Sequence, residues 1–348
     1  MKYKLGIIGY GGMAAWHHSN SSRIENLEVT AAYDIDPERL KLAEEKGLVV
    51  CSTVDELLAM DVDIILIACP NNFHKEYAIY AMSKGKHVVC EKPVALNVAE
   101  LDEMIDASKK YGVLFTVHQN RRWDRDFNIV KKAIADHMLG KPYSIESRVH
   151  GQNGGFLGWR EFKVAGGGML YDWGVHLIDQ ILYLVDEKVT EVYAQLFSIK
   201  EIEVDDYFKL LLRFESGLSA QLEVGTYCLQ PLPRWYVNGD LGSLVIKNWD
   251  CEGSVITANQ YAMDWEPIIV QTSAGPTRTM APRPKETLTE TKLPEVDVDW
   301  ACFYQNVLAT LDGKEELIVK LPEVRRVMQV IDAAFASNEQ GISIKTNI

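Results

Sequence analysis

The first 120 residues alternate short apolar runs with polar, helix-forming segments, and this rhythm restricts the possible folds more than any other feature of the chain. The apolar runs are YKLGIIG (3–9), LEVTAAYD (27–34), VDIILIACP (62–70), KHVVCEKP (86–93) and VLFTVHQN (113–120). Strands that are apolar on both faces and separated by helices are typical of a parallel sheet that is covered on both sides. We therefore predict that residues 1–120 form an α/β domain with a doubly wound parallel sheet.

The remaining residues, 121–348, follow a different pattern. Long stretches such as YFKLLLRFESGLSAQLEVGTY (207–227) alternate apolar and polar residues, and the ESG within this stretch is typical of a hairpin turn. This period of two predicts a second, α+β domain with a large, mostly antiparallel open sheet and helices on one face. We also predict a loop over 273–297 and closing helices over 299–313 and 322–341.

Composition argues against several classes of protein. The formal net charge of −13 opposes binding to nucleic acid or to an anionic membrane surface. The chain has no apolar run long enough to span a bilayer, and glycines and histidines interrupt the first apolar stretch where a signal peptide would continue. The six cysteines lack a CxxC pair or a histidine at zinc spacing. We therefore expect a cytoplasmic protein with reduced thiols, no metal and a small-molecule partner.

The loop after the first apolar run carries a dinucleotide-binding fingerprint. Gly9, Gly11 and Ala14 in GYGGMA fit the pattern G-x-G-x-x-G/A. In this pattern the first glycine allows a tight turn, the second lets a pyrophosphate approach the backbone, and a small third residue lets the helix pack on the sheet. We predict that Gly9, Gly11, Gly12 and Met13 contact a cofactor. An ordinary glycine turn is the alternative.

Asp34 ends the second apolar run, where a carboxylate accepts hydrogen bonds from the adenosine ribose. A turn or helix-cap role before DPER is the alternative. Because Ile35 and Asp36 follow, the 2′-phosphate of NADP would meet negative charge. We therefore predict NAD as the cofactor, with NADP possible if Arg39 swings in.

The segment AGGGMLYDWGVHLIDQILYLV (165–185) is the second chemical motif. On a regular helix its apolar stripe is Leu170, Trp173, Leu177, Ile181 and Leu184. Asp172 and His176 are four residues apart and are therefore expected to be neighbours on another face, with Asp179 close behind. A carboxylate beside an imidazole fixes its tautomer and raises its basicity, as a general base requires. A surface Asp–His pair or a buried structural histidine is the alternative, and no third ligand nearby favours a metal.

Together these motifs resemble the Gfo/Idh/MocA oxidoreductase family, which includes glucose-fructose oxidoreductase, inositol dehydrogenases and biliverdin reductase. GIIGYGGMA, DIDPER, PNNFH, EKP, NRRWD and GGGMLYDWGVHLID occur in the order and at the spacings of that family. The resemblance covers nearly the whole chain. It implies a Rossmann domain followed by an α+β domain whose open sheet often forms a dimer or tetramer interface. It also implies that Lys92 of EKP meets Asp172 and His176 at the nicotinamide.

The resemblance implies further site residues. The implied cofactor contacts are Pro70, Asn72, His74, Glu91, Lys92 and Asn120. Among them, Glu91 would lie against the ribose and His74 would support the PNNFH loop. The family usually has threonine where Cys69 stands, so a hydrogen bond at that position is not expected. The implied substrate contacts are Lys92, Arg122, Trp159, Arg160, Asp172 and His176. Trp159 and Arg160 suit a sugar ring, but they suit ordinary structural roles equally well.

The implied reaction is hydride transfer between the nicotinamide and a ring hydroxyl of a sugar, a glycoside or an inositol-like cyclic polyol. We expect His176 to act as the base, Asp172 to orient it, and Lys92 to stabilise the alkoxide. There are two alternatives. One is a redox-neutral, NAD-dependent glycoside-processing enzyme that works through a keto intermediate. The other is a non-catalytic dinucleotide-binding subunit. We expect a homodimer or homotetramer, formed through the face of the second sheet that carries Leu222 or its neighbours.

Overall fold

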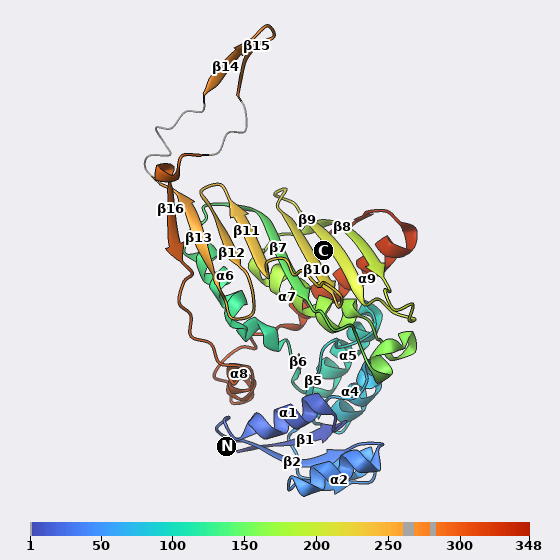
Figure 1. The fold of residues 1–348 in the computed structure, drawn as a ribbon. Helices are drawn as coiled ribbons and strands as arrows, with labels where there is room; N and C mark the ends of the chain where they lie inside the picture. Colours follow the sequence, from blue (N-terminus) through green and yellow to red (C-terminus); the bar gives the residue numbers. More distant parts are fainter. Residues whose placement is uncertain (1, 260–267, 279–282) are drawn as a thin grey trace.

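The N-terminal half of the chain builds a six-stranded parallel sheet in the order β3-β2-β1-β4-β5-β6 (Figure 1). The computed structural model describes residues 2–259, 268–278 and 283–348. In chain order, the elements of this half are β1 (Tyr3–Ile8), α1 (Gly12–Ser21), β2 (Leu27–Tyr33), α2 (Pro37–Glu45), β3 (Val49–Cys51), α3 (Val54–Ala59), β4 (Ile64–Ile67), α4 (His74–Ser83), β5 (His87–Cys90), α5 (Val98–Tyr111) and β6 (Phe115–Val117). All four residues of β4 are fully buried, as the apolar run predicts for a strand covered on both faces.

The second half builds a nine-stranded sheet in the order β16-β13-β12-β11-β7-β10-β9-β8-β17, in which only the β7–β10 pair is parallel among the described strands. Its elements are α6 (Arg125–Ala135), β7 (Pro142–His150), α7 (Val175–Leu184), β8 (Val189–Phe197), β9 (Tyr207–Phe214), β10 (Ser219–Gly225), β11 (Trp235–Gly239), β12 (Gly242–Ile246), β13 (Gly253–Ala258), β16 (Leu288–Lys292), α8 (Cys302–Leu311), α9 (Leu321–Gln340) and β17 (Ile344–Lys345). Helices α6, α7 and α9 lie along one face of this sheet (Figure 1). The predicted fold class is therefore confirmed.

Two sequence expectations fail in this half. The loop predicted over 273–297 contains two strands: β15 (Gly275–Arg278), which pairs with the preceding β14 (Ile269–Thr272) as a hairpin, and β16, which pairs with β13. Residues 279–282 of the predicted loop lie outside the described part of the chain. Leu222 does not lie on the open face either. It is 0% exposed and pairs with the buried Leu210, so the open face belongs to the alternate positions such as Leu211, which is 45% exposed.

The chain crosses back to the first domain near its end. Helix α8 lies beside α1 in Figure 1. The Trp300 ring packs against Trp16 at a centroid distance of 4.7 Å, and the Tyr304 hydroxyl contacts His17 Nδ1 at 2.9 Å. The boundary at residue 120 stays a prediction, because part of the chain beyond it packs on the first domain.

Among the described helices, none is long and apolar enough to cross a membrane. All six cysteines carry free thiols.

Candidate functional site

The predicted site residues gather at one edge of the parallel sheet. Strand β1 lies between β2 and β4, so the chain connections leave in opposite directions there and open a crevice at the carboxyl ends of the strands. The glycine loop follows β1, Asp34 follows β2, Pro70 follows β4, and Glu91 and Lys92 follow β5. This is the edge at which open α/β sheets bind their ligands.

The glycine loop fits a dinucleotide. Gly9 has a φ of +88°, and a Cβ there would lie 2.7 Å from the backbone nitrogen of Cys69, so a larger residue cannot replace it without moving the chain. Gly11 and Gly12 face open space, because a Cβ on either residue would meet no atom within 4 Å. Helix α1 starts at Gly12 with no side-chain cap, which leaves its first N–H groups available to a phosphate.

Asp34 connects this loop to the next one. Its carboxylate accepts hydrogen bonds from the Tyr10 N–H at 2.6 Å and the Asp36 N–H at 2.9 Å. The N-cap of α2 is Asp36, whose side chain accepts from the Glu38 N–H at 3.0 Å, so the cap role belongs to this neighbour. The bond from the Asp36 N–H gives Asp34 the turn role that was the other part of the alternative. Each carboxylate oxygen of Asp34 keeps acceptor capacity for a ribose hydroxyl.

The PNNFH loop is held from two sides. His74 is buried, and its ring nitrogens lie 2.8 Å from the Pro93 carbonyl oxygen and 3.0 Å from the Cys69 carbonyl oxygen. Burial lowers its pKa, so we take it as a neutral ring that donates to one of the two carbonyls. The Asn72 Oδ1 atom is buried and has no hydrogen-bond partner among the described residues. This geometry matches the predicted support role of His74 and leaves Asn72 an acceptor to offer a ligand.

Lys92 reaches across to the second domain and contacts Asp172. Its Nζ donates to the Asp172 backbone oxygen at 2.9 Å and to Asp172 Oδ1 at 3.0 Å. Arg160 Nε lies 3.5 Å from the same carboxylate oxygen. Burial opposes ionisation of Asp172, but Lys92 and Arg160 outweigh it and lower the pKa of this carboxyl. The lysine is therefore a charged group that is held in one place by its counter-ion.

The structure does not show the expected contact between Asp172 and His176. Residues Leu170–Gly174 form a π-helical turn, and α7 begins only at Val175. No hydrogen bond joins the two side chains among the described residues: the carboxylate of Asp172 bonds to Lys92 instead, and the Nδ1 of His176 has no partner. The start of the turn is held by Asp205, which accepts from the Leu170 N–H at 2.8 Å. Burial raises the pKa of Asp205 to about 7.

His176 is buried and neutral. The residue is 4% exposed, and its Nδ1 has no hydrogen-bond partner in the described part of the chain. Burial and the neighbouring Lys92 and Arg121 hold its pKa well below the ordinary value. A buried polar atom without a partner calls for an explanation, and one explanation is that a ligand supplies the partner.

Arg122 does not face Lys92 as a free substrate ligand. Its guanidinium makes a two-pronged contact with Asp179 at 2.8 and 2.6 Å and reaches Glu323 at 2.6 Å. The residue is 5% exposed, so these carboxylates use its donors in a structural ion pair. We therefore leave Arg122 out of the proposed substrate site. Trp159 remains in the proposed substrate site. Its ring centroid lies 4.5 Å from the guanidinium of Arg160, which in turn contacts Asp172.

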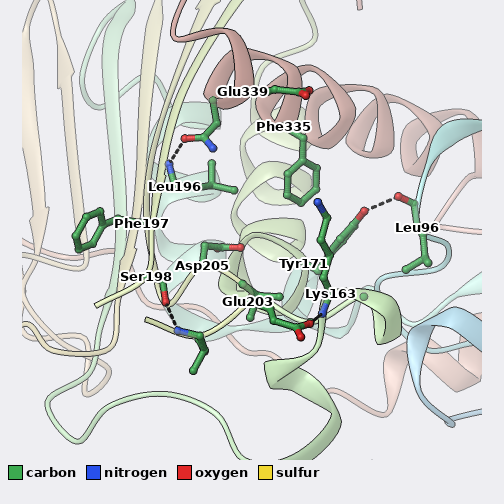
Figure 2. Close-up of a pocket in the computed structure, with 15 residues that line it drawn as sticks. Leu96, Lys163, Tyr171, Leu196, Phe197, Ser198, Glu203, Asp205, Phe335 and Glu339 are labelled. Carbon is green, nitrogen blue, oxygen red and sulfur yellow. Dashed lines mark hydrogen bonds between the residues drawn. The ribbon is translucent and has the colours of Figure 1, made fainter. Parts of the chain in front are cut away.

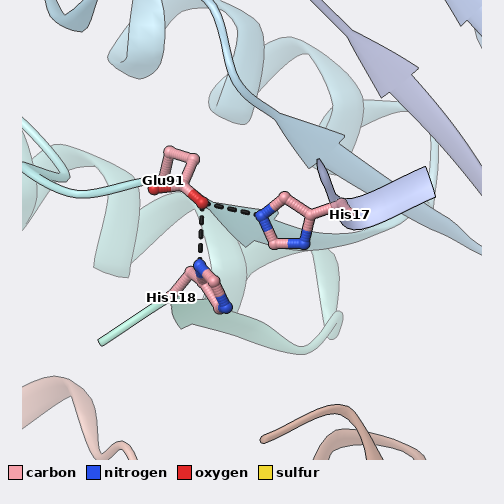
Figure 3. Close-up of side chains that lie close together, drawn as sticks. All are labelled: His17, Glu91 and His118. Atoms are coloured by element: carbon pink, nitrogen blue, oxygen red, sulfur yellow. Dashed lines mark hydrogen bonds and ion pairs between the residues drawn. The ribbon is translucent and has the colours of Figure 1, made fainter. Parts of the chain in front are cut away.

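Glu91 points into a buried cluster (Figure 3). Its Oε1 accepts hydrogen bonds from His17 Nε2 at 2.7 Å and His118 Nδ1 at 2.8 Å, and its Oε2 accepts from the Lys92 N–H at 3.2 Å. Burial opposes ionisation, but the two histidines hold the pKa of Glu91 well below its usual range. Protein groups already bond to both carboxylate oxygens of Glu91. The predicted contact between Glu91 and the ribose of the cofactor therefore stays a prediction.

The same three side chains have the composition of a metal site, with the ligand atoms within 4.8 Å of one another. Every one of those atoms already takes part in a hydrogen bond. Burial lowers the pKa of His17 to about 4, so its neutral ring donates to Glu91 from Nε2 and accepts from the Tyr304 hydroxyl at Nδ1. The three side chains are therefore joined by hydrogen bonds that need no metal ion.

The sequence reasoning did not identify His17, His118 and Tyr304 as partners of the site. His118 directly follows β6 at the ligand-binding edge of the sheet, which is a readable signal. His17 and Tyr304 lack such a signal, because they meet Glu91 only through packing of distant segments. Arg121 was missed too: its guanidinium lies 4.0 Å from the centroid of the Trp173 ring, and Trp173 contacts the His176 ring.

A separate cavity of about 580 Å³ lies behind the π-helical turn (Figure 2). Tyr171, Phe335, Leu196 and Lys163 line it, together with Asp205. Lys92, Asp172 and His176 do not line it, so we do not assign the reaction to this cavity.

Comparison with known proteins agrees with this geometry. Two family models match the chain. The model described as "Oxidoreductase family, NAD-binding Rossmann fold" matches residues 3–119, and the model described as "GFO/IDH/MocA C-terminal domain" matches residues 127–245. The crystal structure of an NAD-binding protein from Listeria innocua is 42% identical, with a TM-score of 0.93 over 99% of both chains.

Two enzymes are also similar. The myo-inositol 2-dehydrogenase of Thermotoga maritima is 32% identical over 222 residues, which cover 62% of this chain and 66% of that enzyme. The scyllo-inositol 2-dehydrogenase (NADP(+)) of Bacillus subtilis is 27% identical over 97% of this chain and 94% of that enzyme. With both domains matched and the cofactor edge intact, the chain belongs to the GFO/IDH/MocA family of NAD-binding oxidoreductases.

Proposed function

We propose that this protein is an NAD-dependent dehydrogenase that oxidises one ring hydroxyl of a sugar, a glycoside or an inositol-like cyclic polyol. The similarity to two inositol dehydrogenases supports this substrate class. The free thiols fit the expected cytoplasmic location.

One observation carries the proposal. An ammonium group fixed by a counter-ion lies near a buried, neutral imidazole whose Nδ1 lacks a partner among the described residues. Oxidation of an alcohol needs a group that takes the hydroxyl proton and a charge that stabilises the alkoxide. His176 and Lys92 supply these two functions.

The residues act as follows. When bound, NAD accepts the hydride from the carbinol carbon. His176 takes the hydroxyl proton at Nδ1, and Lys92 donates a hydrogen bond to the same oxygen. Asp172 positions Lys92, which differs from the expected role of orienting the histidine. Arg160 shares the charge of Asp172 and so keeps this carboxylate ionised.

A hydroxyl-rich ligand also suits three buried acceptors, one on α7 and two in the segments that follow β4 and β6. Gln180 Oε1, Gln119 Oε1 and Asn72 Oδ1 are buried acceptors that have no partner within the described residues. Gln180 follows His176 by one turn of α7, and its amide nitrogen donates to the Arg121 carbonyl at 2.8 Å. Acceptors of this kind are matched by the hydroxyl donors of a polyol.

The test is a panel of inositols, sugars and glycosides, each incubated with NAD and with NADP, with absorbance of the reduced cofactor as the readout. We expect turnover with at least one ring alcohol and NAD, and loss of turnover in the Lys92→Met and His176→Ala variants. Product formation without net reduced cofactor would instead indicate the redox-neutral glycoside-processing reaction. Tight cofactor binding with no product from any compound would indicate a non-catalytic subunit.

We also infer that the open face of the nine-stranded sheet pairs with a second copy of the chain. Phe197, Leu211 and Ile256 lie on this face and are 62%, 45% and 40% exposed. Apolar side chains spread over a broad sheet face are typical of an interface. We expect a dimer or tetramer by light scattering and a monomer for Leu211→Glu, with Leu42→Glu as the control, because Leu42 is an exposed leucine on α2 of the first domain. A monomeric wild-type protein at micromolar concentration would contradict this inference.

A further inference from the structure

Glu91 places a negative charge beneath the proposed active site. It directly precedes Lys92 in the chain, its Oε2 accepts from the Lys92 N–H at 3.2 Å, and its side chain is 7% exposed. His17 and His118 both donate to its other oxygen, at 2.7 and 2.8 Å. The carboxylate therefore cannot turn away or recruit a mobile cation without breaking this network.

The surroundings make this charge effective over a longer range. Phe303 and Tyr304 pack around the His118 ring, and the ring centroids of His17 and His118 lie 4.4 Å apart. Water and salt screen a buried charge much less than an exposed one. One place at which charge changes during the proposed reaction is the nicotinamide ring, which must lie beside Lys92 to receive the hydride.

The two redox forms of the cofactor differ in charge at that ring. Oxidised nicotinamide carries a positive charge. Hydride transfer brings two electrons and a proton from the carbinol carbon and leaves the ring neutral. A fixed carboxylate nearby attracts the positively charged ring of the oxidised cofactor and has little electrostatic interaction with the neutral ring of the reduced cofactor.

We propose that Glu91, held ionised and immobile by His17 and His118, stabilises bound NAD⁺ relative to bound NADH. This inference rests on the proposed function, because it places the nicotinamide beside Lys92. Glu91 acts here through its charge, and His17 and His118 are positioning residues. Binding the oxidised form more tightly favours release of the reduced cofactor after an oxidation.

The test compares dissociation constants for NAD⁺ and NADH, measured by titration of the purified protein without substrate. Glu91→Gln removes the charge and keeps the size of the side chain. We expect the ratio of the NAD⁺ constant to the NADH constant to rise about tenfold, which equals about 1.4 kcal/mol. The potential of the bound couple then rises by about 30 mV, since this is a two-electron couple.

Tyr304→Phe is the matched control. It removes the hydroxyl that contacts His17 Nδ1 at 2.9 Å, so it loosens the same cluster while Glu91 keeps its charge. The ratio should stay at the wild-type value in this variant. If Glu91→Gln fails to fold, Glu91→Asp and Glu91→Asn repeat the comparison of charged and neutral side chains at a shorter, matched length.

Three results would overturn the inference. Equal weakening of both redox forms by Glu91→Gln would mean that Glu91 bonds directly to the ribose. An equal rise of the ratio in Tyr304→Phe would mean that loss of packing, not charge, is responsible. A stoichiometric metal ion in the purified protein, with a ratio that changes on chelation, would mean that His17, Glu91 and His118 bind that metal. Failure of the dehydrogenase proposal would appear separately, in the turnover panel.

Discussion

Lys92→Met tests the central assignment, because it deletes one charge and keeps most of the side-chain volume. An ammonium group has three donor hydrogens. Two of them are directed at Asp172, at 2.9 and 3.0 Å, which leaves one for the oxygen of a substrate. Removing one preorganised donor to a developing oxyanion lowers kcat by about 10²–10³, or about 2.7–4 kcal/mol in barrier height. We expect a loss of this size.

The measurement is steady-state kinetics on the best substrate of the panel, together with NAD binding by titration. The NAD dissociation constant should change little, because the glycine loop and Asp34 supply most of the expected contacts. Lys84→Met is the control, since Lys84 is an exposed lysine of the same domain. A Lys92→Met enzyme within about threefold of the wild-type kcat would differ by less than about 1 kcal/mol, and the assignment would be wrong.

Three further predictions concern the cofactor and the effect of pH. Asp34→Ser should narrow the preference for NAD over NADP by about 1–3 kcal/mol in kcat/KM, and a wild type that prefers NADP would contradict the role of Asp34. Because the pKa of His176 lies well below its ordinary value, the ring is neutral from neutral to alkaline pH. We therefore expect the kcat/KM of the wild type to fall only at acid pH, and we expect this fall to be largely absent in His176→Ala. A wild-type kcat/KM that rises between neutral and alkaline pH, with that rise absent in His176→Ala, would count against the prediction. His17 has its pKa lowered from 6.5 to about 4, so its contribution to stability is complete above 6.5 and is lost as pH falls toward 4. At pH 5 this loss is about 2 kcal/mol in the free energy of unfolding, and denaturant titration measures it. If a His17→Gln variant loses as much stability between pH 7 and 5 as the wild type, His17 is not the cause of the loss.

The chemistry of the first domain was readable because its signals are local. The first glycine of the fingerprint has the positive φ that the pattern requires, and Lys92 follows β5 at the expected edge. The second motif was harder to interpret, because spacing on a helix predicts which side chains are neighbours but not which of several nearby groups they bond. The carboxylate of Asp172 bonds to Lys92 of the first domain, 80 positions away in the chain, and nothing in the segment itself indicates that partner.

Two other features depend on packing that a single sequence does not encode visibly. A period of two shows that Leu210 and Leu212 share one face of β9, but it does not say which face meets the helices. The prediction therefore named Leu222 or its neighbours, and of these the neighbour Gln221, which pairs with the exposed Leu211, lies on the open face. The partners of Glu91 come from residues 17 and 118, which join it only when β5, β6 and α1 are assembled.

The return of α8 to the first domain also bears on how the chain is made. Trp16 and His17 are synthesised long before Trp300 and Tyr304, which cover them; 287 positions separate His17 from Tyr304. During translation, the nucleotide-binding domain therefore exposes an aromatic patch and an unpartnered imidazole nitrogen until the segment that carries α8 has been made. A fragment that ends at residue 120 keeps this patch exposed permanently, so we expect it to be captured by chaperones or to aggregate, whereas a chain that includes α8 buries the patch.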